Sequence, residues 1–175
     1  MSGFYEPAED SYLLSEVLKK EIKNKNIKVL EIGSGSGVQL KILQEIGIKK
    51  ENIFGVDIDI EVVNHCKKLG FSCIKSDLFE NIGGKFNLII FNPPYLPKDN
   101  KEPKKSQLAT TGGKKGSEII NKFLREAKDY LEKDGKIFIL TSNLTKEINW
   151  SGYNKKIVGK KKIFFEELFV WKLKV

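Results

Sequence analysis

The stretch Val29-Leu30-Glu31-Ile32-Gly33-Ser34-Gly35-Ser36-Gly37 decides how this chain folds. It begins with an apolar run that predicts a strand and runs into residues 38–46, whose apolar side chains recur at helical spacing. Glycine permits a tight turn and lets a ligand approach the main chain, and the helix start at Val38 offers free N–H groups to an anion. The G-x-G-x-G spacing is not that of dinucleotide enzymes. Gly33, Gly35 and Gly37 therefore indicate a ligand-binding turn, with a tight turn that binds nothing as the open alternative.

Strand and helix patterns alternate on both sides of this turn. Helices are predicted over Asp10–Lys23, Val38–Ile46, Ile60–Leu69 and Ile119–Leu131, and strands over Lys28–Ile32, Ile53–Asp57, Phe71–Lys75, Phe86–Phe91, Lys136–Thr141 and Lys162–Lys174. This alternation indicates an α/β fold with a mostly parallel sheet and helices on both faces. No clear helix precedes the last strand, so we expect a closing antiparallel hairpin at the C-terminal end.

The length of 175 residues favours one domain over residues 1–175. Residues 1–25 form its N-terminal segment and helix. Residues 97–116 are rich in Lys, Gly, Thr and Pro and predict a long loop, which is usually functional or disordered.

Acidic residues follow the predicted strands where a ligand would lie. Asp57 ends a strand 20 residues after Gly37, where a carboxylate can reach ribose hydroxyls; a helix N-cap is the alternative. Asp77 could hold an adenine amino group beside the Leu78 backbone, or could be a turn residue. Glu31 lies inside a strand, where an acid is costly unless it is satisfied. It would hold the glycine loop or a ligand amino group, or serve as a buried structural hydrogen-bonder.

The segment Asn92-Pro93-Pro94-Tyr95 follows the apolar run Leu88–Phe91. Two prolines make the turn rigid and leave it dominated by hydrogen-bond acceptors. The side-chain carbonyl of Asn92 and the backbone carbonyl of Pro93 can accept both hydrogens of an –NH2 group, and Tyr95 can stack on a planar group. Such acceptors stabilise positive charge on a weakly nucleophilic nitrogen during methyl transfer, as an oxyanion hole does with the opposite sign. A proline-rich turn without a catalytic role is the alternative.

Composition limits the class of protein. The net charge is +8, almost all of it from lysine with Arg125 the sole arginine, which fits either a solvated surface or contact with RNA. Cys66, Cys73 and His65 do not make a credible metal site, so no metal is expected. No apolar run reaches the roughly 18 residues of a membrane helix. The N-terminus does not have the pattern of a signal peptide, so we expect a cytoplasmic protein.

The N-terminal run Tyr5-Glu6-Pro7-Ala8-Glu9-Asp10-Ser11-Tyr12-Leu13-Leu14 is the most distinctive motif. Together with Leu30–Gly37, Asp57, Ser76-Asp77-Leu78 and the NPPY segment, it resembles the archaeal and eukaryotic HemK-type glutamine methyltransferases, over essentially the whole chain. The resemblance implies a Rossmann-like class I methyltransferase with a seven-stranded sheet. It also implies N5-methylation of the glutamine in the Gly-Gly-Gln motif of a class I peptide release factor.

By position, the resemblance places a set of residues around S-adenosylmethionine (SAM), namely Ser11, Glu31, Gly33, Asp57, Asp77, Leu78 and Asn92. It places Asn92, Pro93, Pro94, Tyr95 and Leu96 on the substrate amide, with Asn92, Pro93 and Tyr95 as the catalytic set. It further implies a heterodimer with a small zinc-binding, Trm112-like activator subunit. The strand near Phe71–Ile74 is the candidate sheet edge for that subunit, because exposed strand backbone invites pairing.

Two features depart from the family pattern. The loop Lys98–Lys115 is unusually rich in lysine, and the N-terminal recognition domain of the bacterial enzymes is not present. Substrate recognition would then fall to the loops, to Tyr5–Tyr12 and to a partner. The main alternative is a nucleic-acid methyltransferase that acts on an exocyclic amine, which needs a flipped or single-stranded base. A lysine-directed methyltransferase, whose substrate amine would not need the NPPY acceptors, and a non-enzymatic scaffold are the remaining alternatives.

Overall fold

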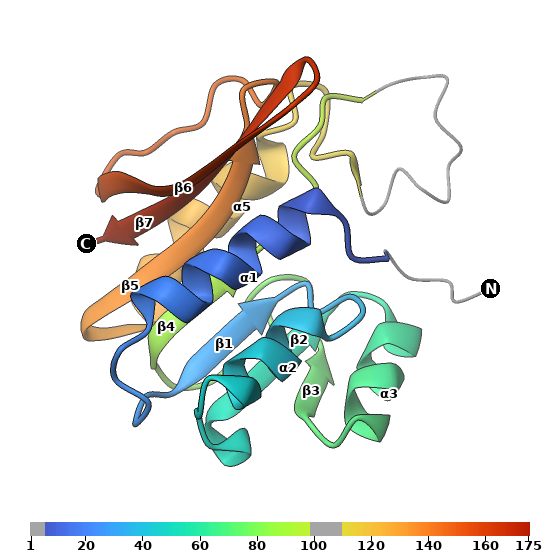
Figure 1. Ribbon diagram of the computed structural model, residues 1–175, viewed down its shortest axis with the longest axis vertical. Coiled ribbons are helices and arrows are strands. Elements are labelled where there is room, and N and C mark those ends of the chain that lie inside the picture. Colours follow the sequence, from blue (N-terminus) through green and yellow to red (C-terminus); the bar gives the residue numbers. More distant parts are fainter. Residues whose placement is uncertain (1–5, 99–109) are drawn as a thin grey trace.

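The glycine-rich stretch joins the middle of a sheet to a helix in the computed structural model, which describes residues 6–98 and 110–175 (Figure 1). Within those residues the sheet has seven strands in the order β3-β2-β1-β4-β5-β7-β6. Their bounds are β1 Val29–Ile32, β2 Ile53–Asp57, β3 Ser72–Lys75, β4 Phe86–Phe91, β5 Leu131–Ser142, β6 Asn154–Ile163 and β7 Glu166–Lys174. β1 to β5 pair in parallel, and β7 pairs antiparallel with both β5 and β6.

The strand order reverses between β1 and β4. From β1 the chain moves outward to β2 and β3, and it then crosses back to place β4 on the other side of β1. In open α/β sheets, ligands bind outside the carboxyl ends of the strands at such a reversal. Both the glycine-rich turn after β1 and the NPPY segment after β4 lie at this point.

Helices cover both faces of the sheet, as the sequence predicts. Helices α1 (Glu9–Glu21), α2 (Val38–Glu45) and α3 (Ile60–Lys68) pack on one face, and α5 (Glu118–Ala127) packs on the other. Two short 3-10 helices, Lys50–Asn52 and Lys128–Tyr130, lead into β2 and β5.

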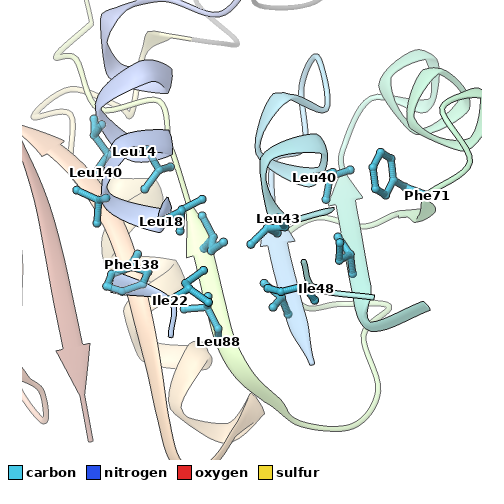
Figure 2. Close-up of a cluster of buried hydrophobic side chains, with 14 of the residues drawn as sticks. Leu14, Leu18, Ile22, Leu40, Leu43, Ile48, Phe71, Leu88, Phe138 and Leu140 are labelled. Atoms are coloured by element: carbon cyan, nitrogen blue, oxygen red, sulfur yellow. The ribbon is translucent and has the colours of Figure 1, made fainter. Parts of the chain in front are cut away.

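The apolar side chains divide between two core layers because successive strand residues point to opposite faces. In β4, Leu88 and Ile90 join the layer under α1 to α3, whereas Ile89 and Phe91 join the layer under α5. Figure 2 shows Leu14 and Leu18 of α1 packed toward the sheet beside Phe138 of β5.

Two predicted boundaries near the C-terminal third are wrong. The helix predicted over Ile119–Leu131 spans Glu118–Ala127, and Leu131 is the first residue of β5. The strand predicted over Lys136–Thr141 therefore starts five residues earlier and ends one residue later. Charged residues between Leu131 and Lys136 hid the start of β5, since they leave no apolar pattern.

The expected antiparallel hairpin at the C-terminal end is confirmed, but the single strand predicted over Lys162–Lys174 includes the turn of that hairpin. β6 ends at Ile163, and β7 begins at Glu166, so a two-residue turn interrupts the predicted strand. β6 itself escaped prediction because it is an edge strand with lysine at Lys155, Lys156 and Lys160–Lys162. Lysine on an edge strand discourages pairing with other chains, and it also removes the apolar signal by which strands are recognised.

Candidate active site

The glycine-rich turn is tied to the neighbouring strand by backbone hydrogen bonds. The N–H groups of Gly33 and Ser34 donate to the carbonyl of Val56 at 2.9 and 3.0 Å. Gly37 precedes α2 with φ +74°, and a Cβ there would lie 3.1 Å from a methyl carbon of Leu69. Any larger residue would be strained at this position, so the close approach of turn and helix requires glycine.

Asp57 fixes this turn from the end of β2. Its Oδ2 accepts the N–H of Gly35 at 3.1 Å, and its Oδ1 accepts the N–H of Asp59 at 3.0 Å. Burial raises the pKa of Asp57, and these backbone hydrogen bonds oppose that rise. Each carboxylate oxygen retains capacity for a further donor. The helix cap next to it is Asp59, whose Oδ1 accepts the N–H of Glu61 at 2.8 Å.

Glu31 is an acid buried in β1, with only 3% of its surface exposed. Its Oε2 is buried and has no hydrogen-bond partner among the described residues. Burial raises the pKa of Glu31 well above its ordinary value, and the nearby Cys73 and Asp57 raise it further. A buried carboxylate of this kind is costly unless a cation or donor satisfies it.

Asp77 lies beyond β3 and makes an ion pair that the sequence did not reveal. Lys122 of α5 donates from Nζ to Asp77 Oδ2 at 2.9 Å, and this bond raises the pKa of Lys122. The next residue, Leu78, has φ +50°, and its carbonyl accepts the Ser76 hydroxyl at 2.9 Å.

Asn92 follows β4 and is oriented by a residue of α1. Its Nδ2 donates to Asp10 Oδ2 at 3.2 Å. Its Oδ1 is buried and has no hydrogen-bond partner among the described residues. A carboxylate can only accept, so Asp10 draws the –NH2 end of Asn92 and turns the carbonyl oxygen away from itself.

The segment after Asn92 is held by glycines of the chain beyond residue 110. A Cβ on Gly112 would lie 2.5 Å from the Pro94 carbonyl oxygen, and one on Gly116 would lie 2.4 Å from the Tyr95 carbonyl oxygen. Thr145 donates its hydroxyl to that Tyr95 carbonyl at 2.9 Å. Leu96 donates its N–H to the Thr110 carbonyl at 2.9 Å. The central part of the predicted lysine-rich loop, residues 99–109, lies outside the described residues, as does Tyr5.

These elements surround a cavity of about 400 Å³. Most of the residues that the sequence singled out line it: Ser11, Glu31, Gly33, Gly35, Asp57, Asp77, Leu78, Asn92, Pro93 and Pro94. Gly37, Tyr95 and Leu96 do not line it. Tyr95 instead packs its half-buried ring against both core layers. The volume suits a ligand the size of a small cofactor.

The described residues contain no cluster of three His, Cys, Asp or Glu that could hold a metal ion. Both cysteines are buried and unpaired by disulfide. No helix within residues 6–98 and 110–175 has the length and apolar character to cross a membrane.

Comparison with known proteins identifies the family. The model of the methyltransferase small domain matches residues 8–150. This chain belongs to that family. A relative from Methanocaldococcus jannaschii, provisionally named a protein N5-glutamine methyltransferase, is 43% identical over 97% of this chain and 92% of its own length. The human methyltransferase HEMK2 is 30% identical over 80% of this chain and 72% of its own length.

Solved structures agree with this methyltransferase fold. The Mtq2–Trm112 complex of E. cuniculi, described as responsible for methylation of the eRF1 termination factor, contains a chain that matches with a TM-score of 0.78. The two chains are 24% identical, and the match covers 98% of each. The Thermus thermophilus 16S rRNA methyltransferase RsmC matches with a TM-score of 0.65 and 19% identity, over 97% of this chain and 43% of its own. These two likenesses support the fold alone.

SAM is the cofactor of this methyltransferase, and the cavity residues fit it. Oε2 of Glu31, which has no hydrogen-bond partner among the described residues, would suit a cationic donor such as the amino group of the methionine moiety. Asp57 stands at the end of β2 beside the strand-order reversal, where ribose hydroxyls are bound in such folds.

Sequence reasoning missed several residues of the methyltransferase cavity, among them the polar side chains of Asp10, Gln39 and Lys122. Gln39 donates from Nε2 to the Ser11 carbonyl at 2.8 Å and accepts from the Ser15 hydroxyl at 3.0 Å, so it ties α1 to α2. Asp10 lay within the quoted N-terminal motif, which was the available signal for it. Nothing local marks Lys122, because its partner Asp77 is 45 positions away in the sequence.

Proposed function

We propose that this chain transfers a methyl group from SAM to the side-chain nitrogen of a protein glutamine. The proposed target is the glutamine of the Gly-Gly-Gln motif in a class I peptide release factor. The observation that carries the proposal is Oδ1 of Asn92 at the wall of the cofactor cavity, which is buried and has no hydrogen-bond partner among residues 6–98 and 110–175. The choice of substrate class is supported by the similarity to the M. jannaschii relative, provisionally named a protein N5-glutamine methyltransferase, and to a Schizosaccharomyces pombe relative named the catalytic subunit of an eRF1 methyltransferase.

The chemistry of an amide explains why such an acceptor is needed. An amide nitrogen shares its lone pair with the carbonyl group and is a poor nucleophile. When bound, SAM supplies an electrophilic methyl group on a positively charged sulfur. Asn92 Oδ1 and the Pro93 carbonyl accept the two N–H groups of the glutamine and hold its nitrogen in line. The same acceptors stabilise the positive charge that builds on nitrogen, and one proton is then lost to water.

Asp10 acts as a positioning residue in this scheme. Its hydrogen bond to Nδ2 determines which end of the Asn92 amide faces the substrate. Without this hydrogen bond the Asn92 amide could rotate by 180° and present its –NH2 group to the –NH2 group of the glutamine. Two donors cannot form a hydrogen bond with each other. We assign substrate contact to the Pro94, Tyr95 and Leu96 backbone as well, and a supporting role to the Tyr95 ring.

A small zinc-binding activator subunit is the proposed partner, with β3 as its docking edge. β3 is the outer strand of the described sheet on that side, and it pairs only with β2. Exposed isoleucines gather at this edge: Ile74 lies on β3 opposite Val56, and Ile58 follows β2 directly. Unpaired strand backbone beside exposed apolar side chains suits pairing with a strand of another chain. A role in translation termination would place the complex in the cytoplasm.

The test is a methyl-transfer assay with labelled SAM, with and without the activator subunit. Four acceptors are offered: the cognate release factor, its Gly-Gly-Gln→Gly-Gly-Ala variant, total RNA and total DNA. We expect label on the wild-type factor only. Asn92→Ala should lower kcat by about 100-fold or more, the effect of removing one transition-state hydrogen-bonding group. Because Asn92 lines the cofactor cavity, the melting temperature and the circular dichroism spectrum of the variant serve as the folding control. Label on nucleic acid with the factor untouched would replace this proposal by the nucleic-acid alternative.

A further inference from the structure

The tip of the β6–β7 hairpin exposes two adjacent aromatic side chains. Phe164 and Phe165 form the turn between Ile163 and Glu166, and 89% and 97% of their surfaces are exposed. They are the most exposed large apolar residues of the described chain. Figure 1 shows this hairpin reaching past the end of the sheet.

The backbone at the tip is also unfavourable for its residue. Phe164 has φ +50°, in the left-handed region that glycine, asparagine or aspartate occupies in most hairpin turns. A bulky aromatic residue is costly there, and its side chain gains no burial within the described chain in return. An exposed aromatic pair of which one member, Phe164, has a strained backbone is a feature that contact with another molecule would explain.

The register of the sheet places the tip on the substrate side of the molecule. β4 ends at Phe91 opposite Ile139 of β5, and Ile139 pairs in turn with Trp171 of β7. Phe165 precedes Trp171 by six residues, so the tip stands about 20 Å beyond the level of Phe91, the residue before Asn92, along the strand direction. A ligand that reaches both the cavity and the tip must therefore be a macromolecule.

The β6–β7 hairpin is bound to two parts of the chain that hold the NPPY segment: the start of α1 and the residues directly after β5. Lys161 of β6 makes an ion pair with Glu9, next to the residue that orients Asn92. On the other side, Glu167 of β7 donates its N–H to Asn143 at 2.8 Å. Asn143 lies two residues before Thr145, which binds the Tyr95 carbonyl. The tip is therefore held in a fixed place relative to the cavity.

We propose that Phe164 and Phe165 dock the folded protein substrate, by inserting into an apolar surface whose border is acidic. This inference rests on the proposed function, since it assigns a docking surface for the same methylated protein. The border is inferred from charge: Lys156 and Lys162 of β6 are exposed, and neither makes an ion pair with another described residue, whereas Lys160 and Lys161 do. Acidic side chains on the substrate would complement this strand.

Phosphate-bearing partners fit the tip less well. Lys160 and Lys161 are already paired with Glu167 and Glu9. The hairpin contains no arginine, the residue that most often stacks on bases or grips phosphate with two hydrogen bonds.

The test compares the wild type with a Phe164→Ser/Phe165→Ser double variant. Neither substitution removes buried surface, so the fold should persist, and unchanged SAM affinity would verify this. We expect KM for the full-length release factor to rise at least tenfold, with kcat within about twofold of the wild type. Methylation of a short Gly-Gly-Gln peptide, which cannot reach the tip, should be unaffected. Ile157→Ser, on the same hairpin but away from the turn, is the matched control.

Other outcomes separate the two proposals. If the wild type methylates the factor and the double variant has an unchanged KM, the docking surface is wrong and the proposed function stands. If the wild type does not methylate the factor, both fail. Binding of RNA or anionic vesicles that the wild type shows and the double variant loses, with KM for the factor unchanged, would assign the tip to a phosphate-bearing partner and overturn the inference.

Discussion

At the scale of single residues, the site depends on acids and amides whose hydrogen bonds are incomplete. Glu31 Oε2 and Asn92 Oδ1 are both buried and unpartnered among the described residues, and both belong to residues that line the cavity. Leaving a buried polar atom unsatisfied costs about 1–3 kcal/mol. The ligands proposed for these two atoms, a cationic amino group and an amide N–H, would satisfy both and remove this cost.

The Glu31→Gln variant tests how much stability the protein loses by burying the Glu31 carboxylate when SAM is absent. Because burial raises the folded-state pKa of Glu31 above the ordinary 4.5, the folded protein holds this proton more tightly than the unfolded chain. Its contribution to stability is therefore fully present below pH 4.5 and is lost as the pH rises toward the folded-state pKa. The Glu31→Gln variant avoids this loss of stability, because a glutamine side chain stays neutral as the pH rises. At pH 7 the SAM-free variant should melt about 2–8 °C higher, from a gain of about 1–2 kcal/mol.

The same variant should bind SAM at least tenfold more weakly, because the neutral amide replaces the negative partner of the amino group. Melting curves at pH 4 and pH 7, with and without SAM, measure both effects. The advantage in Tm should be larger at pH 7 than at pH 4. If the variant is less stable than the wild type at pH 7, Glu31 stabilises the SAM-free protein through a structural contact, and its role is not confined to binding the cofactor.

Sequence reasoning could name residues such as Glu31, Asp57 and Asn92 because each ends or interrupts a recognisable apolar run. It could not assign Asp10 to Asn92 or Lys122 to Asp77. Those pairs are 82 and 45 positions apart, and only the crossing of α1 and α5 over the sheet brings them together. Local pattern predicts which elements exist, and tertiary packing decides which of their side chains meet.

At the scale of elements, the predicted strands were most accurate where they are buried on both faces. β2 and β4 have the predicted bounds. The errors lie at the C-terminal hairpin, where β6 is exposed and lysine-rich and its turn consists of two apolar residues instead of glycine or asparagine. The turn escaped notice because its residues have high strand propensity. That mismatch between residue type and turn is the same feature that suggests a docking role.

The residues directly before α5 pack closely against the NPPY segment, and glycine makes this close contact possible. Gly112 has no room for a side chain, since a Cβ would lie 2.2 Å from the Gly116 carbonyl oxygen and 2.5 Å from that of Pro94. Gly112→Ala should therefore push the segment after Asn92 out of place. We expect kcat to fall by about 100-fold, because displacements near 1 Å have effects of this size, while SAM affinity changes by less than about threefold.

Gly83→Ala is the matched control for that experiment, because a Cβ there meets nothing within 4 Å and the backbone needs no positive φ. Steady-state kinetics with saturating SAM and calorimetry with SAM alone separate the two effects. Equal losses in kcat and SAM affinity would mean that the substitution disturbs the whole cavity, and that the glycine does not serve the substrate side specifically.

At the scale of the whole molecule, the two outer strands of the described sheet, β6 and β3, differ in the side chains that they expose to solvent. β6 carries lysines along its length and stands beside α1, to which Gly159 packs closely through Val17. β3 is only four residues long and presents Ile74 with 41% of its surface exposed. A short strand with an exposed isoleucine lacks the charged protection of β6, which fits an edge that a partner covers. The strand order confirms that β3 is outermost in the described sheet, and its use as the docking edge for the activator subunit stays a prediction.

Ile74→Lys and Ile157→Lys form a matched pair for testing this asymmetry, because the two isoleucines are 41% and 42% exposed on opposite edge strands. Lysine at position 74 would place a charge in the proposed interface, so affinity for the activator subunit should fall at least tenfold. Lysine at position 157 should leave that affinity within about twofold. SAM binding should be unchanged in both variants, since neither side chain lines the cavity. Titration calorimetry measures the affinity of each variant for the purified activator subunit. If Ile157→Lys, and not Ile74→Lys, loses this affinity, the activator subunit binds at β6. It would then compete with the substrate for the β6–β7 hairpin.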